Sequence, residues 1–120
     1  MIIAVDFDDT LFRYLPGHPV STIGPPILET LRLVHYLWKQ GHQLILWTCR
    51  EDTPGNPALS QALQACETYG LQFDAVNEHV PGRPPQWPNS RKVYADVYLD
   101  DRSCRSPEDV YLIPGINLGK

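Results

Sequence analysis

The sequence predicts an α/β fold with a central, mainly parallel sheet that is covered on both faces. Short apolar runs, as at residues 2–5 and 44–47, are typical of buried parallel strands. Longer stretches with apolar residues at helical spacing separate these runs, so strands and helices alternate along the chain. A length of 120 residues fits a single domain, residues 1–120, with a core of its own.

The first strand is expected at residues 2–7 and ends in acidic residues. Residues 13–24 show no clear period and contain proline and glycine, so we expect a loop or short flap. Pro25 and Pro26 are expected to open the first helix, because proline suits a first helical turn. Gly41 is expected to end that helix.

The second strand, residues 44–48, is apolar up to its final threonine. The second helix is expected from about residue 58 to 69, with apolar residues on one face and a glycine directly after it. Asp74 and Asp96 lie beside apolar strand residues, and we expect both to be structural. The remaining strands are expected at residues 73–76, 97–101 and 110–113.

Acidic and hydroxyl side chains follow the predicted strands. Right-handed crossovers place the carboxyl ends of parallel strands along one edge, where ligands bind in such folds. The residues predicted at this edge are Asp6, Asp8, Thr48, Asp100 and Asp101. Carboxylates that lie close together repel, and a cation or a shared proton relieves the repulsion. Oxygen ligands with no paired histidine or cysteine favour Mg²⁺ over zinc.

The same edge suits phosphoryl transfer. One carboxylate acts as a nucleophile and its neighbour as a general acid and base. Thr48 adds a hydroxyl, the backbone amides after it are able to hold an anion, and Lys92 supplies a cation from the loop before the fourth strand. Together these groups indicate a phosphorylated substrate. Residues 6–10 taken alone also fit an acidic turn that merely closes a strand.

The chain resembles the hydrolases of the haloacid dehalogenase (HAD) superfamily, whose four motifs it matches in order. The first motif, Asp-x-Asp-x-Thr, matches Asp-Phe-Asp-Asp-Thr at residues 6–10, and the second matches Thr48. The third, a basic residue, best matches Lys92, with Arg91 as its rival. The fourth, paired acids after an apolar strand, matches residues 100–101. The resemblance covers nearly the whole chain.

This resemblance implies a phosphatase that hydrolyses phosphomonoesters with Mg²⁺. Asp6 would attack the phosphorus and form an aspartyl-phosphate, and Asp8 would be the general acid and then the general base. The resemblance implies a metal site made by Asp6, the backbone carbonyl of Asp8, and the acids Asp100 and Asp101. Asp101 is expected to be the direct ligand and Asp100 to act through a water molecule.

The resemblance also assigns the groups that meet the substrate. Thr48 would hydrogen-bond the phosphoryl group, and Lys92 would neutralise charge there. Cys49, Arg50 and Asn77 are further candidates for lining the substrate pocket. The simpler interpretation makes Cys49 a small packed residue and Arg50 a solvated loop residue.

Superfamily members differ by cap domains, inserted after the first motif or between the third strand and the third motif. Residues 11–24 and 77–91 occupy these places here and are too short to fold as domains. The resemblance therefore implies a three-layer, Rossmann-like HAD fold without a cap. Such a site is open, so either a large substrate or a neighbouring subunit of a homo-oligomer is expected to cover it.

Composition narrows the partners and the compartment. A net charge of −4 leaves no broad basic surface, so a nucleic-acid partner is not favoured. No stretch is long and apolar enough to span a membrane, and the N-terminal residues lack the features of a signal peptide. Three cysteines without CxxC spacing fit a reducing, cytoplasmic location.

Three other functions are compatible with parts of this pattern. One is a phosphatase that processes nucleic-acid ends, against which the acidic balance counts. Another is a catalytically silent binding module that keeps the HAD fold, although a degenerate protein would be expected to have lost Asp6 or Asp8. A receiver domain of phosphorelay signalling also has acids, threonine and lysine at strand ends. Its phosphorylated aspartate lies on a middle strand, however, whereas here the acidic pair follows the first strand.

Overall fold

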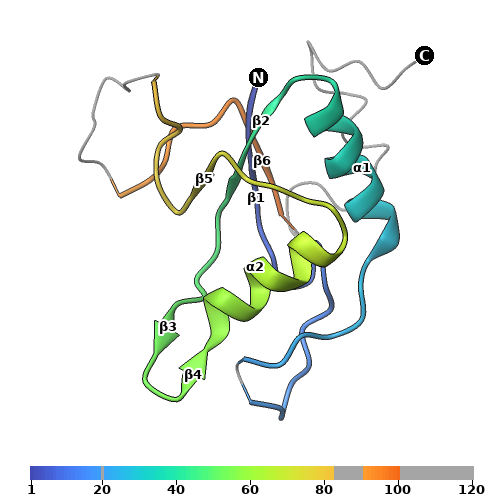
Figure 1. Ribbon diagram of the computed structural model, residues 1–120, viewed down its shortest axis with the longest axis vertical. Helices are drawn as coiled ribbons and strands as arrows, with labels where there is room; N and C mark the ends of the chain where they lie inside the picture. Colours follow the sequence, from blue (N-terminus) through green and yellow to red (C-terminus); the bar gives the residue numbers. More distant parts are fainter. Residues whose placement is uncertain (20, 83–90, 101–120) are drawn as a thin grey trace.

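The computed structural model of the chain describes residues 1–19, 21–82 and 91–100. A parallel four-stranded sheet with the order β5-β2-β1-β6 forms its centre (Figure 1). The protein therefore has an α/β structure with a mainly parallel central sheet, as predicted, and is compatible with a Rossmann-like fold. The elements in chain order are β1 (Ile2–Val5), α1 (Leu28–Lys39), β2 (Gln43–Leu46), β3 (Asp52–Thr53), β4 (Asn56–Pro57), α2 (Ala58–Thr68), β5 (Ala75–Val76) and β6 (Val97–Leu99).

β1 lies inside the sheet and pairs with a strand on each side. Its register with β2 joins Val5 to Leu46, and its register with β6 joins Val5 to Leu99. All four residues of β1 are buried. Burial on both faces explains why this segment is apolar throughout instead of alternating between polar and apolar residues.

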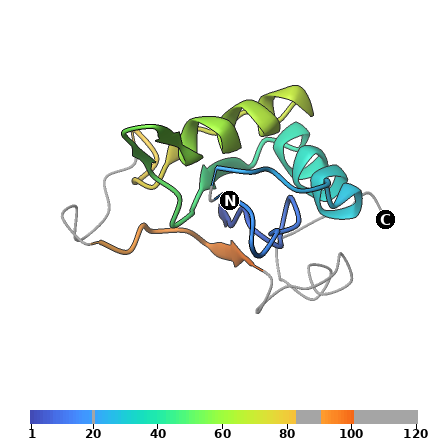
Figure 2. The ribbon, with the colours of Figure 1, turned by 90° about the horizontal axis from the view of Figure 1, so that it is seen from below.

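Both helices pack side by side against one face of the sheet (Figure 2). Alternate strand residues point to this face, where Ile3 and Val5 join the apolar sides of the helices. Helix residues of this core include Leu31, Val34 and Leu37 of α1 and Ala62 and Cys66 of α2. On the opposite face, Ile2, Ala4 and Ile45 pack against Val80, Val93 and Ala95, which lie outside the helices and strands.

The first helix begins later than expected. Pro25 and Pro26 precede α1 instead of forming its first turn, and Pro26 makes an antiparallel bridge with Phe12. The amide of Ile27 donates to the carbonyl of Leu11 over 2.8 Å, which keeps this stretch extended. The prolines therefore serve the connection between the flap and the helix.

The strands are shorter at their carboxyl ends than the sequence predicts. The first ends at residue 5 instead of 7, because the carbonyl of Phe7 turns to accept amides from the following loop, Leu11 at 2.9 Å among them. The second covers residues 43–46 instead of 44–48, because the amide of Thr48 bonds a side chain and not a neighbouring strand. The strand expected at residues 110–113 lies outside the described residues.

Asp74 and Asp96 are structural, as predicted. Each accepts a hydrogen bond from the backbone at the amino end of a strand: the amide of Leu44 donates to Asp74 over 2.8 Å, and the amide of Ile2 donates to Asp96 over 2.7 Å. These carboxylates satisfy amides at the edge opposite to the acidic one. They anchor the entry into β2 and β1.

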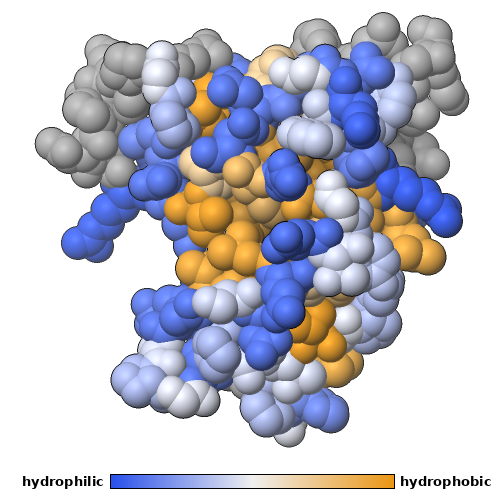
Figure 3. All heavy atoms as spheres, in the orientation of Figure 1, coloured by the Kyte–Doolittle hydropathy of each residue, from blue (hydrophilic) through white to orange (hydrophobic). Residues whose placement is uncertain are grey.

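The surface in the orientation of Figure 1 has hydrophobic atoms gathered near its centre and hydrophilic atoms around them (Figure 3). Within residues 1–19, 21–82 and 91–100, no helix has the length and apolar character needed to cross a membrane.

Candidate functional site

The carboxyl ends of the four parallel strands meet at one edge, and the predicted polar residues follow them there. Asp6 comes after β1, Thr48 after β2, Asn77 after β5 and Asp100 after β6. The chain passes from β1 outward through β2 to β5, and then returns to place β6 on the other side of β1. The boundary between β1 and β6 is thus the topological switch point, which is where open α/β sheets bind ligands.

Asp6 and Asp100 lie at this switch point. They follow Val5 and Leu99, which are register partners, and the amide of Asp6 donates to the carbonyl of Leu99 over 2.9 Å. Two half-buried acidic residues directly after adjacent strands provide hard oxygen donors of the kind that Mg²⁺ prefers. The donor chemistry of this pair therefore fits the predicted metal.

The described residues contain no group of three or more His, Cys, Asp or Glu side chains able to hold a metal ion. The set implied by the family resemblance takes a backbone carbonyl from Asp8 and includes Asp101, which lies outside the described residues. The metal site as a whole therefore stays a prediction.

The loop after β1 is tightly folded and fixes the backbone beside Asp8. Asp9 has a φ of 59°, a left-handed conformation that Asp tolerates better than most residues. The amide of Asp9 donates to the carbonyl of Phe12 over 2.7 Å, and its side chain accepts the amide of Tyr14 over 2.9 Å. Thr10 is buried, and its hydroxyl has no hydrogen-bond partner within the part of the chain that the structure describes.

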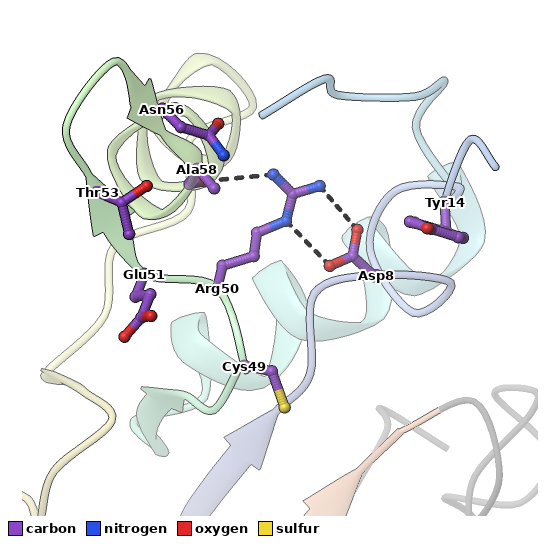
Figure 4. A pocket seen from close by; sticks show the side chains of 8 residues that line it. All are labelled: Asp8, Tyr14, Cys49, Arg50, Glu51, Thr53, Asn56 and Ala58. Carbon is purple, nitrogen blue, oxygen red and sulfur yellow. Dashed lines mark hydrogen bonds and ion pairs between the residues drawn. The ribbon is translucent and has the colours of Figure 1, made fainter. Parts of the chain in front are cut away.

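Asp8 forms a two-pronged ion pair with Arg50 (Figure 4). The Nε of Arg50 donates to Oδ2 of Asp8 over 2.9 Å, and Nη2 donates to Oδ1 over 2.8 Å. The planar guanidinium matches the planar carboxylate, so both oxygens are held at once. Asp8, the predicted general acid and base, is therefore paired with the cationic side chain of Arg50.

Arg50 is itself held from several sides. Its Nη1 donates to the carbonyl of Ala58 over 3.2 Å and Nη2 donates to the carbonyl of Thr22 over 3.1 Å, while the guanidinium carbon lies 4.8 Å from the centroid of the Phe7 ring. The side chain is only 8% exposed, against 31% for Asp8. The simpler expectation of a solvated loop arginine is therefore wrong, because this residue links two loops, the flap and α2.

Thr48 and Asn77 lie together at the ends of β2 and β5. The amide of Thr48 donates to Oδ1 of Asn77 over 2.8 Å, and Oγ1 of Thr48 accepts the amide of Arg50 over 3.1 Å. Asn77 has a φ of 53°, which Asn adopts more easily than most residues. The Asn77 side chain thus shapes the loop that carries Thr48 and Arg50.

A pocket of about 340 Å³ opens beside the ion pair of Asp8 and Arg50 (Figure 4). One wall comes from the loop after β2 and from the β3–β4 hairpin, and the other wall comes from the loop after β1. The sequence did not predict this hairpin. The lining residues are Asp8, Tyr14, Cys49, Arg50, Glu51, Thr53, Asn56 and Ala58. Cys49 is exposed in this pocket, so the expectation that it packs as a small apolar residue is wrong.

The hairpin is tied to the start of α2 through one acidic residue. Asp52 of β3 accepts the amide of Ser60 over 2.9 Å and also a short hydrogen bond from the Ser60 hydroxyl. The hydrogen bond from the Ser60 hydroxyl has the larger effect and the one from the Ser60 amide the smaller, and both lower the pKa of the Asp52 carboxyl from its ordinary value. An ionised Asp52 therefore fastens the wall of the pocket to the helix.

Lys92 lies on the segment before β6, with its Nζ 5.0 Å from the centroid of the Tyr98 ring. The neighbouring Arg91 is exposed. The assignment of the third motif to Lys92, and not to Arg91, stays a prediction.

Comparison with known proteins finds a solved structure that is similar to this chain. No family model and no curated protein matches the chain. A solved structure, that of a conserved protein from Bacteroides thetaiotaomicron, has a TM-score of 0.69 and 34% sequence identity to it. The alignment covers 88% of this chain and 79% of that one.

Proposed function

We propose that this chain, which belongs to the same family as the conserved protein from Bacteroides thetaiotaomicron, is a HAD-type phosphatase. The proposed activity is the Mg²⁺-dependent hydrolysis of phosphate esters. Asp6 is the nucleophile, and Asp8 is the general acid and base. The name of the solved relative states no activity, so the proposal depends on the chemistry of the residues.

The observation that carries the proposal is the pairing of acidic residues at the switch point. Asp6 and Asp100 follow register partners on β1 and β6, and Thr48 follows β2 on the other side of β1. A nucleophile, a hydroxyl and a second acid on neighbouring strand ends form the set that phosphoryl transfer requires. An acidic turn with no chemical role does not explain acids on two separate strands at this place.

The reaction consists of two displacements at phosphorus. In the first, an oxygen of Asp6 bonds to the phosphorus while the bond to the leaving oxygen breaks, and Asp8 supplies a proton to that oxygen where it needs one. In the second, a water oxygen attacks the phosphorus, its proton passes to Asp8, and the bond from Asp6 breaks. Thr48 donates to the transferring group, and Lys92 offsets its negative charge.

Mg²⁺ would be held by Asp6, the backbone carbonyl of Asp8, and the acids Asp100 and Asp101. When bound, the ion offsets the negative charge of the carboxylates and of the phosphoryl group. In its absence, the charges of the acidic cluster and of the substrate repel each other. Metal removal is therefore expected to abolish both phosphate binding and hydrolysis.

The architecture proposed for the site is a three-layer Rossmann-like fold without a cap. In the described parts of residues 11–24 and 77–91, where caps are inserted in the superfamily, no helix or strand is present. The β3–β4 hairpin, residues 52–57, lies beside the pocket together with Ala58, the first residue of α2. An open site of this kind suits a large substrate, or a neighbouring subunit that covers the site.

The proposal is tested by hydrolysis of p-nitrophenyl phosphate with Mg²⁺ and with excess chelator. Activity is expected only with the metal, and it should be lost in Asp6→Asn. Asp74→Asn is the matched control, because Asp74 is also an aspartate beside a sheet strand but serves the opposite edge. If Asp6→Asn retains the activity of the wild type, or if Asp74→Asn loses as much as Asp6→Asn, the proposed site is wrong.

A silent binding module would show no hydrolysis above the Asp6→Asn background. Calorimetric titration with Mg²⁺ then separates the remaining cases. Heat of binding in the wild type but not in Asp6→Asn would leave an intact metal site without this activity.

A further inference from the structure

We propose that the pocket beside the ion pair receives the leaving group of the substrate, and that Glu51 makes it select leaving groups without a negative charge. This inference rests on the proposed function and names its substrate class. The class consists of phosphate monoesters of uncharged aromatic or polyhydroxy compounds, as distinct from phosphorylated carboxylic acids and bisphosphates.

The position of the pocket supplies the first step. Asp8 lines the pocket, and in the proposed reaction it serves the leaving oxygen. A leaving group whose oxygen meets Asp8 therefore has the pocket directly beside it. The volume of about 340 Å³ lies within the range of roughly 300–1,000 Å³ that is usual for small-ligand pockets. The pocket is therefore large enough for one small organic group.

The charges on the pocket wall supply the second step. The lining residues that carry a charge are Asp8, Arg50 and Glu51. Arg50 and Asp8 offset each other through hydrogen bonds of 2.9 and 2.8 Å. Glu51 is exposed, and within residues 1–19, 21–82 and 91–100 its carboxylate has no ion-pair partner. The wall thus has a net negative charge, which repels a carboxylate or a second phosphate on the leaving group.

The uncharged lining residues fit a leaving group that has an aromatic ring or hydroxyl groups. Tyr14 is 49% exposed, and its ring gives an aromatic surface on one side of the ion pair (Figure 4). Thr53 and Asn56 of the hairpin lie on the other side, and their hydroxyl and amide groups both donate and accept hydrogen bonds. These groups bind hydroxyls without requiring a charge on the ligand.

Both walls of the pocket are held in place by side chains that bond the backbone. The side chain of Asp9 accepts the amide of Tyr14 over 2.9 Å, and the φ of 59° at Asp9 turns the chain there. Across the pocket, Asp52 accepts the amide of Ser60 over 2.9 Å and so holds the hairpin to α2. The pocket therefore has a defined shape before a ligand binds, as is usual for small-molecule sites.

The test uses two phosphate esters that differ by one charge. The kcat/KM of the wild type is measured with p-carbamoylphenyl phosphate and p-carboxyphenyl phosphate at fixed Mg²⁺ concentration. The carboxamide and the carboxylate have nearly the same size, and both leaving groups are phenols. Repulsion between exposed charges about 4 Å apart corresponds to roughly 5-fold in an equilibrium constant, so the carboxamide ester is expected to be preferred by about 5-fold or more. Equal values for the two esters would overturn the inference.

A pair of variants locates the cause in Glu51. Glu51→Gln removes the charge and keeps the shape of the side chain, so the preference for the carboxamide ester is expected to fall to about 2-fold or less. Glu67→Gln is the matched control, because Glu67 is also exposed but lies in the last turn of α2, whereas the pocket meets the first residue of that helix. The control changes the net charge of the protein by the same amount away from the pocket, so the wild-type preference should remain. A preference that persists in Glu51→Gln, or that falls equally in Glu67→Gln, would refute the role of Glu51.

Cys49 reports whether the pocket is occupied, without any need for hydrolysis. It is exposed and lines the pocket, so a bound ligand should slow its alkylation by iodoacetamide. The probes are p-carbamoylbenzylphosphonate and p-carboxybenzylphosphonate, whose phosphorus–carbon bond is not hydrolysed. With Mg²⁺ present, the concentration that halves the alkylation rate is expected to be about 5-fold lower for the carboxamide. Alkylation that neither phosphonate slows would overturn the placement of the leaving group in this pocket.

The outcomes separate this inference from the proposed function. Hydrolysis of both esters with equal kcat/KM would leave a phosphatase whose pocket does not select by charge. If the wild type hydrolyses neither ester, the proposed function fails. The phosphonates then still decide the inference, because stronger protection of Cys49 by the carboxamide would support charge selection in the pocket, and equal protection by both would refute it.

Discussion

Arg50 and Asp8, 42 residues apart in the chain, share two hydrogen bonds of 2.9 and 2.8 Å that join the loop after β2 to the loop after β1. The two loops belong to neighbouring parallel strands, whose register places their carboxyl ends side by side. The pair thus connects the residue predicted to move protons with the wall of the pocket. Its contributions to stability and to chemistry are separable by experiment.

The ion pair is expected to stabilise the fold. Breaking a buried pair costs several kcal/mol, but Asp8 is 31% exposed, so we expect Arg50→Met to lower the free energy of unfolding by about 1–3 kcal/mol. Urea denaturation of this variant, of Asp8→Asn and of the double variant measures the coupling. Because each single change leaves the other partner without its bond, the double variant should lose less than the sum of the singles. Strictly additive losses would contradict the pairing.

Asn77 is expected to matter through both its side chain and its backbone. Asn77→Ala removes the acceptor for the amide of Thr48 and places Ala at a φ of 53°, so a loss of about 1–2 kcal/mol in stability is expected. Asn77→Gly removes the same acceptor but relieves the backbone, so it should cost about half as much. Thermal denaturation of both variants gives the comparison. A larger loss for the glycine variant would refute the account of this loop.

The described cysteines are expected to differ sharply in reactivity. Burial raises the pKa of the Cys66 thiol to about 12, so at pH 8 this residue stays protonated in the folded protein and does not attack an alkylating reagent. Cys49 is exposed in the pocket. Iodoacetamide at pH 8, followed by peptide mass spectrometry, should label Cys49 in the native protein and Cys66 only after denaturation. Labelling of both residues at equal rates in the native protein would show that α2 does not pack as described.

The anchor of the hairpin is expected to weaken in acid. The hydrogen bonds from Ser60 lower the pKa of Asp52 below the ordinary value of 3.8, so the ionised carboxylate favours the folded state. This contribution is present above about pH 4 and is lost as the pH falls through the lowered value. The melting temperature of Asp52→Ala should therefore lie below that of the wild type at pH 7, and the two should converge in acid. A difference that persists at the lowest pH at which both fold would contradict this role.

The elements that depend on apolar pattern were predictable from the sequence. The buried run at residues 2–5 and the helical spacing between Leu31 and Leu37 reflect the large apolar area that these segments bury. The ends of the elements were less predictable, because they depend on contacts with distant residues. β2 ends at Leu46, since beyond it the amide of Thr48 bonds Asn77, 29 residues away.

The candidate site was predictable only as a set of strand ends. Asp6 and Asp100 were placed together by the rule that parallel strands share one edge, and the register of β1 with β6 agrees. The burial of Arg50 was not predictable, because nothing near it in sequence shows that the loop after β1 brings Asp8 to it. The β3–β4 hairpin was missed because its strands are only two residues long and contain or flank prolines, which favour a loop assignment.

Attack of Asp6 on phosphorus is tested most directly by capture of the phosphorylated residue. The protein is mixed with p-nitrophenyl phosphate and Mg²⁺, stopped during turnover and treated with borohydride, which reduces an acyl phosphate to an alcohol. This role of Asp6 predicts that peptide mass spectrometry finds homoserine at position 6, only when both substrate and metal are present. Hydrolysis that proceeds without any such adduct at Asp6, or that continues undiminished in Asp6→Asn, would contradict it.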